Sequence, residues 1–397
     1  MALPERVSQN RKANEQLLYF TSSSLRGDDG ELFFLSDASG HPNIIARCLS
    51  TGRERPLTQN AGGFLKSYVY FDGVPYSGLG KASISLHARS GSLYYIQGLQ
   101  IRKIDPSGQD TLLAAYPHGQ MTGFTHVSDD GRFLCVPTTD ARALDGDQRL
   151  SGKPDYNIDE RIRQERLCSY LRVYDTESGE EVVCEAVPGG WVTHVQFAPG
   201  DPGVILYNHE WASDCGIRRM WLFDGREHRP LRDEGEHRSR NDWVCHEMWE
   251  RDGTGIIYHG KYQDGPAFIG RVEASGTKCI EIALPDNYQR YGHFTVGRHG
   301  ELVSDACYEE PGDKKTGGSD WISMVHVNWS AREFQWTPLC RNSSSWDSQD
   351  AHPHPILDHA GRSCYFTSDQ DGRRAIYRIP CNLPASDLNG LPQGRLN

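Results

Sequence analysis

The sequence predicts an all-β protein, a seven-bladed β-propeller with four-stranded antiparallel blades. The 397 residues include 41 glycines, and aromatic residues make up 10% of the chain. This composition is typical of a turn-rich β protein, because aromatic side chains favour strands and glycine favours turns. A short unit also recurs seven times: a turn that ends in glycine, then an alternating run of β-branched and aromatic residues. The turn glycines are Gly30, Gly91, Gly131, Gly203, Gly253, Gly300 and Gly361.

Each recurring unit predicts a small antiparallel sheet. A turn ending in Asp-Gly or Ser-Gly before an alternating run is a hairpin signal, because glycine supplies the positive φ that a tight turn needs. A second strand follows in every unit, and a further short strand follows in most. The second strands are predicted at residues 43–49, 100–105, 170–175, 219–223, 268–273, 321–327 and 375–379, and further strands at 181–185 and 278–283. The result is a meander of roughly fifty residues, the size of a propeller blade.

The seven units fill the chain, so we expect residues 1–397 to form a single propeller. Because the last blade runs out of sequence after Ile379, we expect the segment before Tyr19 to help close the ring. Two insertions interrupt the repeat. Residues 139–166 are polar and charged and predict a loop with a short helix, and residues 309–320 predict a flexible loop by composition. Long insertions between propeller strands usually shape a binding face.

Charge and cysteine usage limit the possible partners and location. The formal net charge of −11 argues against nucleic acid or an acidic membrane as the main partner, since both need a broad basic surface. It does not exclude a small acidic substrate, because a metal and two arginines can reverse the field locally. The 11 scattered cysteines contain no C-x-x-C pair, and the polar N-terminus has no apolar signal segment. We therefore expect reduced, mostly buried thiols in a cytoplasmic protein; the oligomeric state stays open.

Histidines recur at a similar place in six of the seven units. They precede the turn glycine by four to nine residues, and they are His87, His126, His194, His246, His293 and His354. This position predicts that each lies early on the innermost strand of its blade. Because innermost strands run the same way around one channel, we expect at least three of these side chains to meet at one mouth of it. The alternative is a scatter of surface histidines.

The motif Gln349-x-x-His352-x-His354 adds two histidines one residue apart. On an extended strand such residues point the same way, and Pro353 between them stiffens the chain. Gln349 can reach the same point if the chain bends. Imidazole nitrogens and an amide oxygen are ligand types of a divalent metal. Alone, a His-x-His pair is more often an ordinary strand feature, and the repeated histidines favour the metal site.

The side chains beside this motif suggest an active site. The metal candidates are His293, Gln349, His352 and His354, with His246 as a further imidazole nearby. The ordinary pKa of histidine, near 6.5, suits a general base at neutral pH. Arg219 could be catalytic or an ordinary surface arginine. We name four further candidates for substrate contact: His126, His194, His209 and Arg218.

These residues resemble the oligogalacturonate lyase family, seven-bladed propellers of the bacterial and fungal pectin degradation pathway. The resemblance is firm over residues 193–378. Its motifs are the stretch at residues 193–202, His209-Glu210, Arg219-Met220-Trp221, residues 245–249 and Gln349-x-x-His352-x-His354. The resemblance implies a metal, usually manganese, on His293, Gln349, His352 and His354. It implies His246 as the base and Arg219 as the catalytic arginine. The two insertions have no match in the family.

The implied reaction is β-elimination on short 4-linked uronate oligosaccharides, which leaves an unsaturated uronate. A metal on the carboxylate would act as a Lewis acid while His246 takes the C5 proton. Two alternatives stay open: a lyase for another uronic-acid glycan, such as a rhamnogalacturonan or a glucuronate-containing oligosaccharide, and a non-catalytic binding scaffold. A peptidase is disfavoured, because no G-x-S-x-G nucleophile motif is present.

Overall fold

The computed structural model describes residues 3–67, 78–143, 158–210, 218–232, 238–239, 241–284, 292–306, 320–382 and 394–396. It contains two compact units, one of Met1–Phe20 with Asp242–Asn397 and one of Thr21–Asn241. We call them the terminal unit and the central unit. Seven antiparallel sheets of four or five strands make up the described chain. The predicted fold class, a seven-bladed β-propeller, is confirmed.

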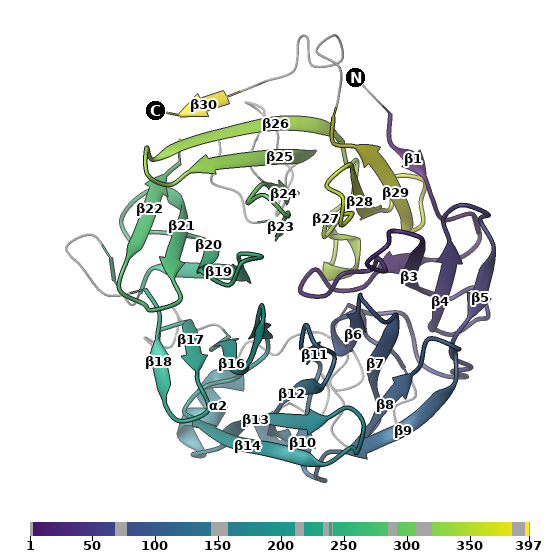
Figure 1. The fold of residues 1–397 in the computed structure, drawn as a ribbon, viewed down its shortest axis with the longest axis horizontal. Coiled ribbons are helices and arrows are strands. Elements are labelled where there is room, and N and C mark those ends of the chain that lie inside the picture. The colour runs from purple at the N-terminus through teal and green to yellow at the C-terminus, as the bar shows by residue number, and fades with distance from the viewer. Residues whose placement is uncertain are drawn as a thin grey trace. The chain divides into compact units, whose positions relative to one another are not determined.

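The central unit holds most of the first half of the chain (Figure 1). Its elements are β3 (Glu31–Ser36), β4 (Asn43–Cys48), β5 (Glu54–Pro56), η1 (Lys81–Ser83), β6 (Ile84–His87), β7 (Ser92–Gln97), β8 (Gln100–Ile104), β9 (Asp110–Ala115), β10 (Gln120–Met121), β11 (His126–Val127), β12 (Phe133–Asp140), η2 (Ala141–Ala143), α2 (Ile158–Gln164), β13 (Cys168–Asp175), β14 (Glu181–Pro188), β15 (Val195–Ala198), β16 (Asp201–Asn208), β17 (Met220–Phe223) and β18 (His228–Pro230).

The terminal unit joins the beginning of the chain to its last third. Its elements are β1 (Glu5–Arg6), β2 (Glu15–Leu17), β19 (Trp243–Trp249), β20 (Gly255–Lys261), β21 (Ala267–Glu273), β22 (Cys279–Ala283), β23 (Phe294–Val296), β24 (Leu302–Ser304), β25 (Trp321–Asn328), β26 (Glu333–Arg341), η4 (Gln349–Ala351), β27 (Ile356–Leu357), β28 (Ser363–Ser368), β29 (Ala375–Pro380) and β30 (Gly394–Leu396).

The sheets follow chain order, as a meander predicts. Their strand orders are β2-β3-β4-β5, β6-β7-β8-β9, β10-β12-β13-β14 with β11 also on β12, β15-β16-β17-β18, β19-β20-β21-β22, β23-β24-β25-β26-β30, and β1-β29-β28-β27. Every predicted second strand is present within a few residues; the one predicted at 170–175, for example, is β13. Alternation and turn chemistry were sufficient here because, apart from β1 and β30, the strands of each blade are close together in sequence.

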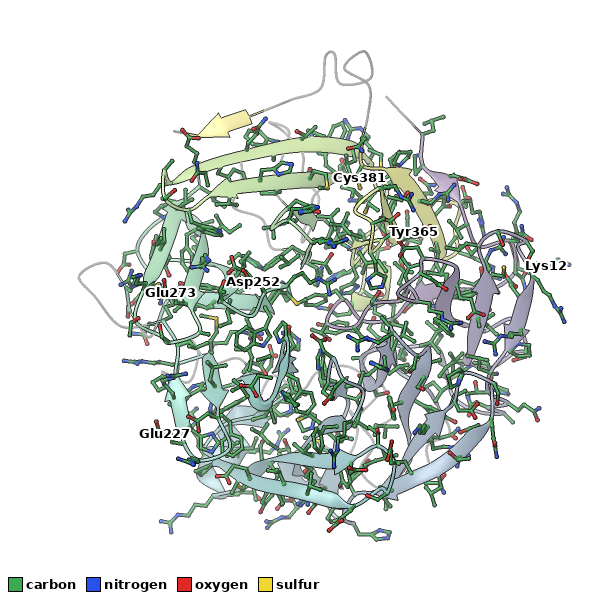
Figure 2. The ribbon with its side chains drawn as sticks, viewed as in Figure 1. Lys12, Glu227, Asp252, Glu273, Tyr365 and Cys381 are labelled. Carbon is green, nitrogen blue, oxygen red and sulfur yellow. The ribbon has the colours of Figure 1, made fainter. Side chains whose placement is uncertain are left out.

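The turns that begin each unit differ in which residue adopts the left-handed backbone conformation. Gly131 and Gly253 have φ of 74° and 72°, as the hairpin signal predicts. In the first unit the positive φ, 55°, falls on Asp29 rather than on Gly30. Aspartate tolerates this conformation because its short side chain bonds locally. The turn before β20 shows such bonding, since Asp252, labelled in Figure 2, accepts a hydrogen bond from the Thr254 amide at 3.0 Å.

The N-terminal segment completes the last blade, as predicted. Strand β1 lies beside β29 (Figure 1), with Glu5 opposite Arg378 and Arg6 opposite Tyr377. Beyond the strand, the Val7 amide donates to the Ile376 carbonyl at 2.8 Å. The first residues of the chain thus supply the fourth strand of a sheet whose other strands come from its end.

Apolar cores lie between neighbouring sheets within each unit. In the central unit, residues of β13 and β14 pack on residues of β15 and β16, with Leu171 and Phe197 among them. In the terminal unit, one cluster joins β20 to β25 and another joins β24 to β28, with Ile257 in the first and Phe366 in the second. Strand side chains alternate between faces, so each blade offers one apolar face to each neighbour.

The predicted insertions are partly described. Strand β12 extends through Asp140, so the first insertion begins later than residue 139, and α2 supplies the expected short helix. Residues 144–157 and 309–319 lie outside the described residues. Nine described cysteines are present as thiols; four are buried and one is exposed, so fewer are buried than expected. No helix among the described residues is long and apolar enough to cross a membrane.

Candidate active site

Three histidines of the terminal unit converge on one point. His293 directly precedes β23, and His352 and His354 lie between η4 and β27. All three are buried, and one ring nitrogen from each lies within 4.8 Å of the others. The ring centroids of His293 and His354 are 3.9 Å apart, and those of His293 and His352 are 5.2 Å apart. We call these three residues the histidine cluster.

The His352-Pro353-His354 segment is not the extended strand that we predicted. Residues 352–355 carry no regular structure, and strand β27 starts only at Ile356. His354 adopts a left-handed backbone with φ of 46°. Its Nδ1 lies 3.1 Å from the His352 carbonyl oxygen. The two rings are close, with centroids 5.8 Å apart, because the chain turns between them rather than because strand side chains alternate.

Gln349 opens the short 3₁₀ helix η4 that leads into His352. His352 follows directly after η4, and its amide donates to the Gln349 carbonyl at 3.4 Å. The sequence had required a bend for Gln349 to reach the cluster, and η4 is such a bend. The side-chain oxygen Oε1 of Gln349 is buried.

The donor set fits a divalent metal. Nε2 of His293, Nε2 of His354, Nδ1 of His352 and Oε1 of Gln349 are buried and make no hydrogen bond within the described part of the chain, although each of these residues has other contacts. Neutral imidazole nitrogens with an amide oxygen suit manganese, zinc or a similar ion. The three histidine nitrogens are stronger evidence for a metal site than the glutamine oxygen, because they lie within 4.8 Å of one another.

Aromatic rings surround the histidine cluster. Phe20 stacks on His354 with ring centroids 5.7 Å apart, and it lies 5.4 Å from His293. Trp346 lies 4.7 Å from His352 on another side. These rings lower the local dielectric, so charges placed at the cluster interact more strongly than in water.

His246 lies beside the cluster, on a bulge in β19. The pairing of β19 with β20 shifts between Cys245 and Met248, and His246 has φ of 51°. A β-bulge re-aims side chains, and here it brings the ring of His246 within 4.4 Å of the ring of His293. Its Nδ1 lies 2.5 Å from the Gly292 carbonyl oxygen and 2.9 Å from Nε2 of His259.

The contact with Gly292 sets the proton on His246. A carbonyl oxygen only accepts hydrogen bonds, so Nδ1 carries the proton in this contact and Nε2 keeps its lone pair. A base requires such a lone pair. Gly292 is needed for the close approach, because a Cβ there would collide with Ala306 and Asp305.

A second polar group lies in the central unit around Arg219. Its Nη1 is 3.2 Å from Oε1 of Glu210, and its Nη2 is 3.5 Å from Nδ1 of His194. Oε2 of the same glutamate accepts from Thr193 Oγ1 at 2.7 Å and from Asn208 Nδ2 at 2.9 Å. Arg219 is 7% exposed, so the interpretation as an ordinary surface arginine is wrong.

The other substrate-contact candidates occupy different settings in the central unit. The ring of His209 is buried between Tyr207 and Trp221, and desolvation lowers its pKa to about 4, assisted by His228. Burial also lowers the pKa of His126 to about 4, against the opposing effect of Asp129. Arg218 is half-buried, and its carbonyl accepts from Trp221 Nε1 at 2.7 Å.

The repeated histidines do not all begin an innermost strand. His126 starts β11, and His194 and His293 directly precede their strands, as predicted. His87 instead ends β6, where its ring contacts Ser90 Oγ and the Asp129 carbonyl. Its spacing to the turn glycine is the shortest of the six, so it lies at the end of the strand, directly before the turn.

Several residues of the site were missed by the sequence reasoning. Asp305 contacts His293 and the backbone of His354, Phe20 and Trp346 surround the cluster, and His259 contacts His246. Of these residues, only Asp305 could have been found from the sequence. The hairpin that pairs Phe294 with Ser304 places His293 opposite Asp305, and that pairing follows from the turn at Gly300.

The chain is similar to known lyases. A protein family described as oligogalacturonate lyase matches residues 155–386. An oligogalacturonide lyase of Pectobacterium atrosepticum is 26% identical over 226 residues, and an oligogalacturonate lyase of Dickeya dadantii is 27% identical over 224 residues. Each match covers 53% of this chain and 54% of the relative, so the chain spans about half the length of the curated relatives it matches.

The similarity in structure extends further along the chain. A solved structure described as an oligogalacturonate lyase in complex with manganese matches with a TM-score of 0.74 at 20% identity. That match covers 96% of this chain and 93% of the other. At this identity the match shows a shared fold.

Proposed function

Because the chain belongs to the oligogalacturonate lyase family, we propose that it is a metal-dependent lyase that cleaves short 4-linked uronate oligosaccharides by β-elimination. The observation that carries this proposal is the histidine cluster, with three buried ring nitrogens within 4.8 Å of one another. The ring of His246 at 4.4 Å from His293 adds a candidate base beside it. The proposed product is an oligosaccharide with an unsaturated uronate at its end.

The residues that would hold the metal are His293, His352 and His354, with Gln349 as the fourth ligand. Manganese is the proposed ion, since a structure of similar fold is described in complex with it. When bound, the ion supplies positive charge that neutralises the uronate carboxylate and makes the hydrogen on C5 more acidic. The three histidines are buried and have the rings of Phe20 and Trp346 beside them, and such low-dielectric surroundings strengthen this effect.

His246 is the proposed base. Its Nδ1 donates to the Gly292 carbonyl, so Nε2 is the atom that accepts the C5 proton. As the proton leaves C5, the bond between C4 and O4 breaks and a double bond forms between C4 and C5. O4 keeps the electron pair of the broken bond and takes a proton from solvent water, so the released sugar ends in a hydroxyl group. The bulge in β19 holds the ring in place, which removes the entropy cost of orienting it.

Arg219 is proposed to pair with a carboxylate of the acidic oligosaccharide. Its planar guanidinium suits bidentate pairing with a carboxylate, and Glu210 holds it through a 3.2 Å contact. His194 contacts the same guanidinium. His194, His209, Arg218 and His126 remain the proposed substrate contacts of the central unit. A chain with a net charge of −11 needs local positive charge of this kind to bind an acidic oligosaccharide.

We also propose that the protein works in the cytoplasm. Its described cysteines are thiols, and a reducing compartment keeps them so. Fractionation of cells that express the native protein, with an antibody against it, would check this location.

The rival function is a binding scaffold with a structural metal. A scaffold would retain the metal but release no product from any uronide. The family matches favour the lyase, since both curated relatives carry that name. A lyase for another uronic-acid glycan is the second rival, and it differs only in substrate.

The test compares metal content and lyase activity in the wild type and in His352→Ala/His354→Ala. We expect about one transition-metal ion per chain in the wild type and none in the double variant, because half of the ligands are removed. The exposed His326→Ala, on β25 of the same unit, is the matched control and should retain its metal. Activity is read as ultraviolet absorbance of the unsaturated product from oligogalacturonides, oligoglucuronides and rhamnogalacturonan fragments. Metal without product from any of these would favour the scaffold, and absence of metal after soaking with manganese would contradict the metal centre.

A further inference from the structure

Asp305 lies under the histidine cluster and is fully buried. It directly follows β24, and the β23–β24 hairpin places it opposite His293. Its backbone amide donates to the His293 carbonyl at 3.1 Å, which extends the ladder by one pair. A buried carboxylate is costly unless several donors compensate it. The contacts of Asp305 are therefore informative about why it is there.

Three donors from the histidine cluster converge on this carboxylate. The His293 amide donates to Oδ1 at 2.5 Å, and Nδ1 of the same residue lies 3.1 Å from Oδ2. The His354 amide donates to Oδ2 at 3.1 Å. Two of the four metal candidates are thus bonded to one side chain, which none of our sequence reasoning selected.

The contact with the His293 ring decides which nitrogen can bind a metal. An ionised carboxylate has no proton to give, so the bond at 3.1 Å requires the proton on Nδ1 of His293. Nε2 then carries the lone pair, and the whole side chain of His293 is buried. A metal-binding histidine commonly donates its other N–H to a carboxylate in this way, which raises its basicity as a ligand.

The contact with the His354 backbone acts on the second ligand. His354 has a φ of 46°, a left-handed conformation that has an energetic cost for a residue other than glycine. The bond from its amide to Oδ2 offsets part of that cost. The same backbone conformation lets Nδ1 of His354 contact the His352 carbonyl, so that Nε2 is again the atom left for a metal.

We propose that Asp305 is a positioning residue of the metal centre, which holds His293 in the tautomer with Nδ1 protonated and holds the backbone of His354, so that both rings present Nε2 to the metal. The inference rests on the metal centre of the proposed function. Asp305 is not itself a ligand here, because the compact ligand group consists of His293, His352 and His354. It joins two sheets of the terminal unit, because Asp305 follows β24 of one sheet and His354 precedes β27 of the other.

The test uses Asp305→Ala and the milder Asp305→Asn, with manganese affinity and the His293 tautomer as readouts. We expect the dissociation constant for Mn²⁺, from calorimetry, to rise about 10- to 100-fold in Asp305→Ala, the usual effect of removing such a partner. Asp305→Asn should lose less affinity, because an amide keeps one acceptor oxygen. In metal-free wild type, ¹⁵N NMR should show Nδ1 of His293 protonated; in Asp305→Ala the proton should move to Nε2 or exchange between both.

Asp358→Ala is the matched control for loss of a buried carboxylate in the same unit. Asp358 accepts a hydrogen bond from the Arg362 amide at 2.6 Å in the turn before β28. The Asp358→Ala change should lower the melting temperature of the metal-free protein while leaving Mn²⁺ affinity and the His293 tautomer unchanged. If Asp305→Ala behaves the same way, Asp305 is merely structural and the inference is overturned. That outcome leaves the proposed function intact, whereas a wild type that binds no Mn²⁺ overturns both.

Discussion

At the residue scale, three imidazoles of the site share one arrangement. Nδ1 of His246 contacts the Gly292 carbonyl, Nδ1 of His354 contacts the His352 carbonyl, and Nδ1 of His293 contacts Asp305. Each contact places the proton on Nδ1 and leaves Nε2 with a lone pair. Two of these three residues also have positive φ, which non-glycine residues rarely adopt. Strain of this kind persists where surrounding contacts impose it, as at functional sites.

The role of His246 is tested by His246→Asn. Asparagine tolerates a φ of 51° better than most residues, so the bulge should survive the change. We expect kcat on oligogalacturonides to fall about 10²- to 10⁴-fold, the usual contribution of a general base. Metal content, measured by elemental analysis, should stay at the wild-type level. Loss of the metal would instead place His246 among the ligands and remove its assignment as the base.

At the element scale, short strands at chain-distant positions build the site. The bulge in β19 directs His246, the β23–β24 hairpin pairs His293 with Asp305, and η4 turns the chain into His352. Strand β1 completes the sheet of β27, β28 and β29, the sheet that follows the His352–His354 segment. An edge strand without its partner exposes a row of backbone groups that favours unfolding and aggregation.

The contribution of β1 is tested by removing residues 2–8. The truncated chain loses the ladder between β1 and β29 and the bond from the Ile376 amide to Ser8 Oγ. We expect a lower melting temperature and aggregation on heating, measured by calorimetry and light scattering. Glu5→Ala is the matched control, since it removes only the exposed 2.6 Å ion pair with Arg378, and such pairs contribute about 0–1 kcal/mol. Equal melting temperatures for the truncated chain and the wild type would show that β1 adds nothing.

At the scale of the whole molecule, buried neutral histidines make stability depend on pH. The pKa of His209 is about 4 in the folded protein, against an ordinary value of 6.5. Between these values the unfolded chain binds a proton on this residue and the folded chain does not. The contribution of the neutral His209 ring to the free energy of unfolding is therefore complete above about pH 6.5, and it is lost as the pH falls towards 4. Tyr207 and Trp221 pack on the ring, and the nearby His228 adds to the effect.

This pH dependence is tested by His209→Gln. The variant lacks the titrating ring, so its free energy of unfolding should fall less steeply between pH 6.5 and pH 4. The slope should differ by up to about 1.4 kcal/mol per pH unit, the value for one proton. Urea unfolding at several pH values measures it, and the difference at pH 8 gives the packing cost separately. An unchanged acid slope would show that His209 does not contribute.

The sequence by itself determined the local plan of the molecule. Turn glycines, alternation and a recurring unit depend on residues close in the chain, so the strands, the blade count and the closure by β1 could be predicted. The residues of the histidine cluster could also be named, because a metal site requires particular residue types. The strand predicted for His352-Pro353-His354 was wrong, because alternation says nothing of how packing bends an irregular segment.

Only the tertiary structure decided how these residues act. Asp305 contacts His354 across 49 residues of chain, His246 contacts Gly292 across 46, and Phe20 stacks on His354 from the far end of the sequence. No local pattern encodes such contacts, because they arise when separate sheets pack together. The proton positions of His293 and His246 depend on them. The proposed metal ligands could therefore be listed from the sequence, but their tautomers, their burial and the proposed role of Asp305 follow from packing alone.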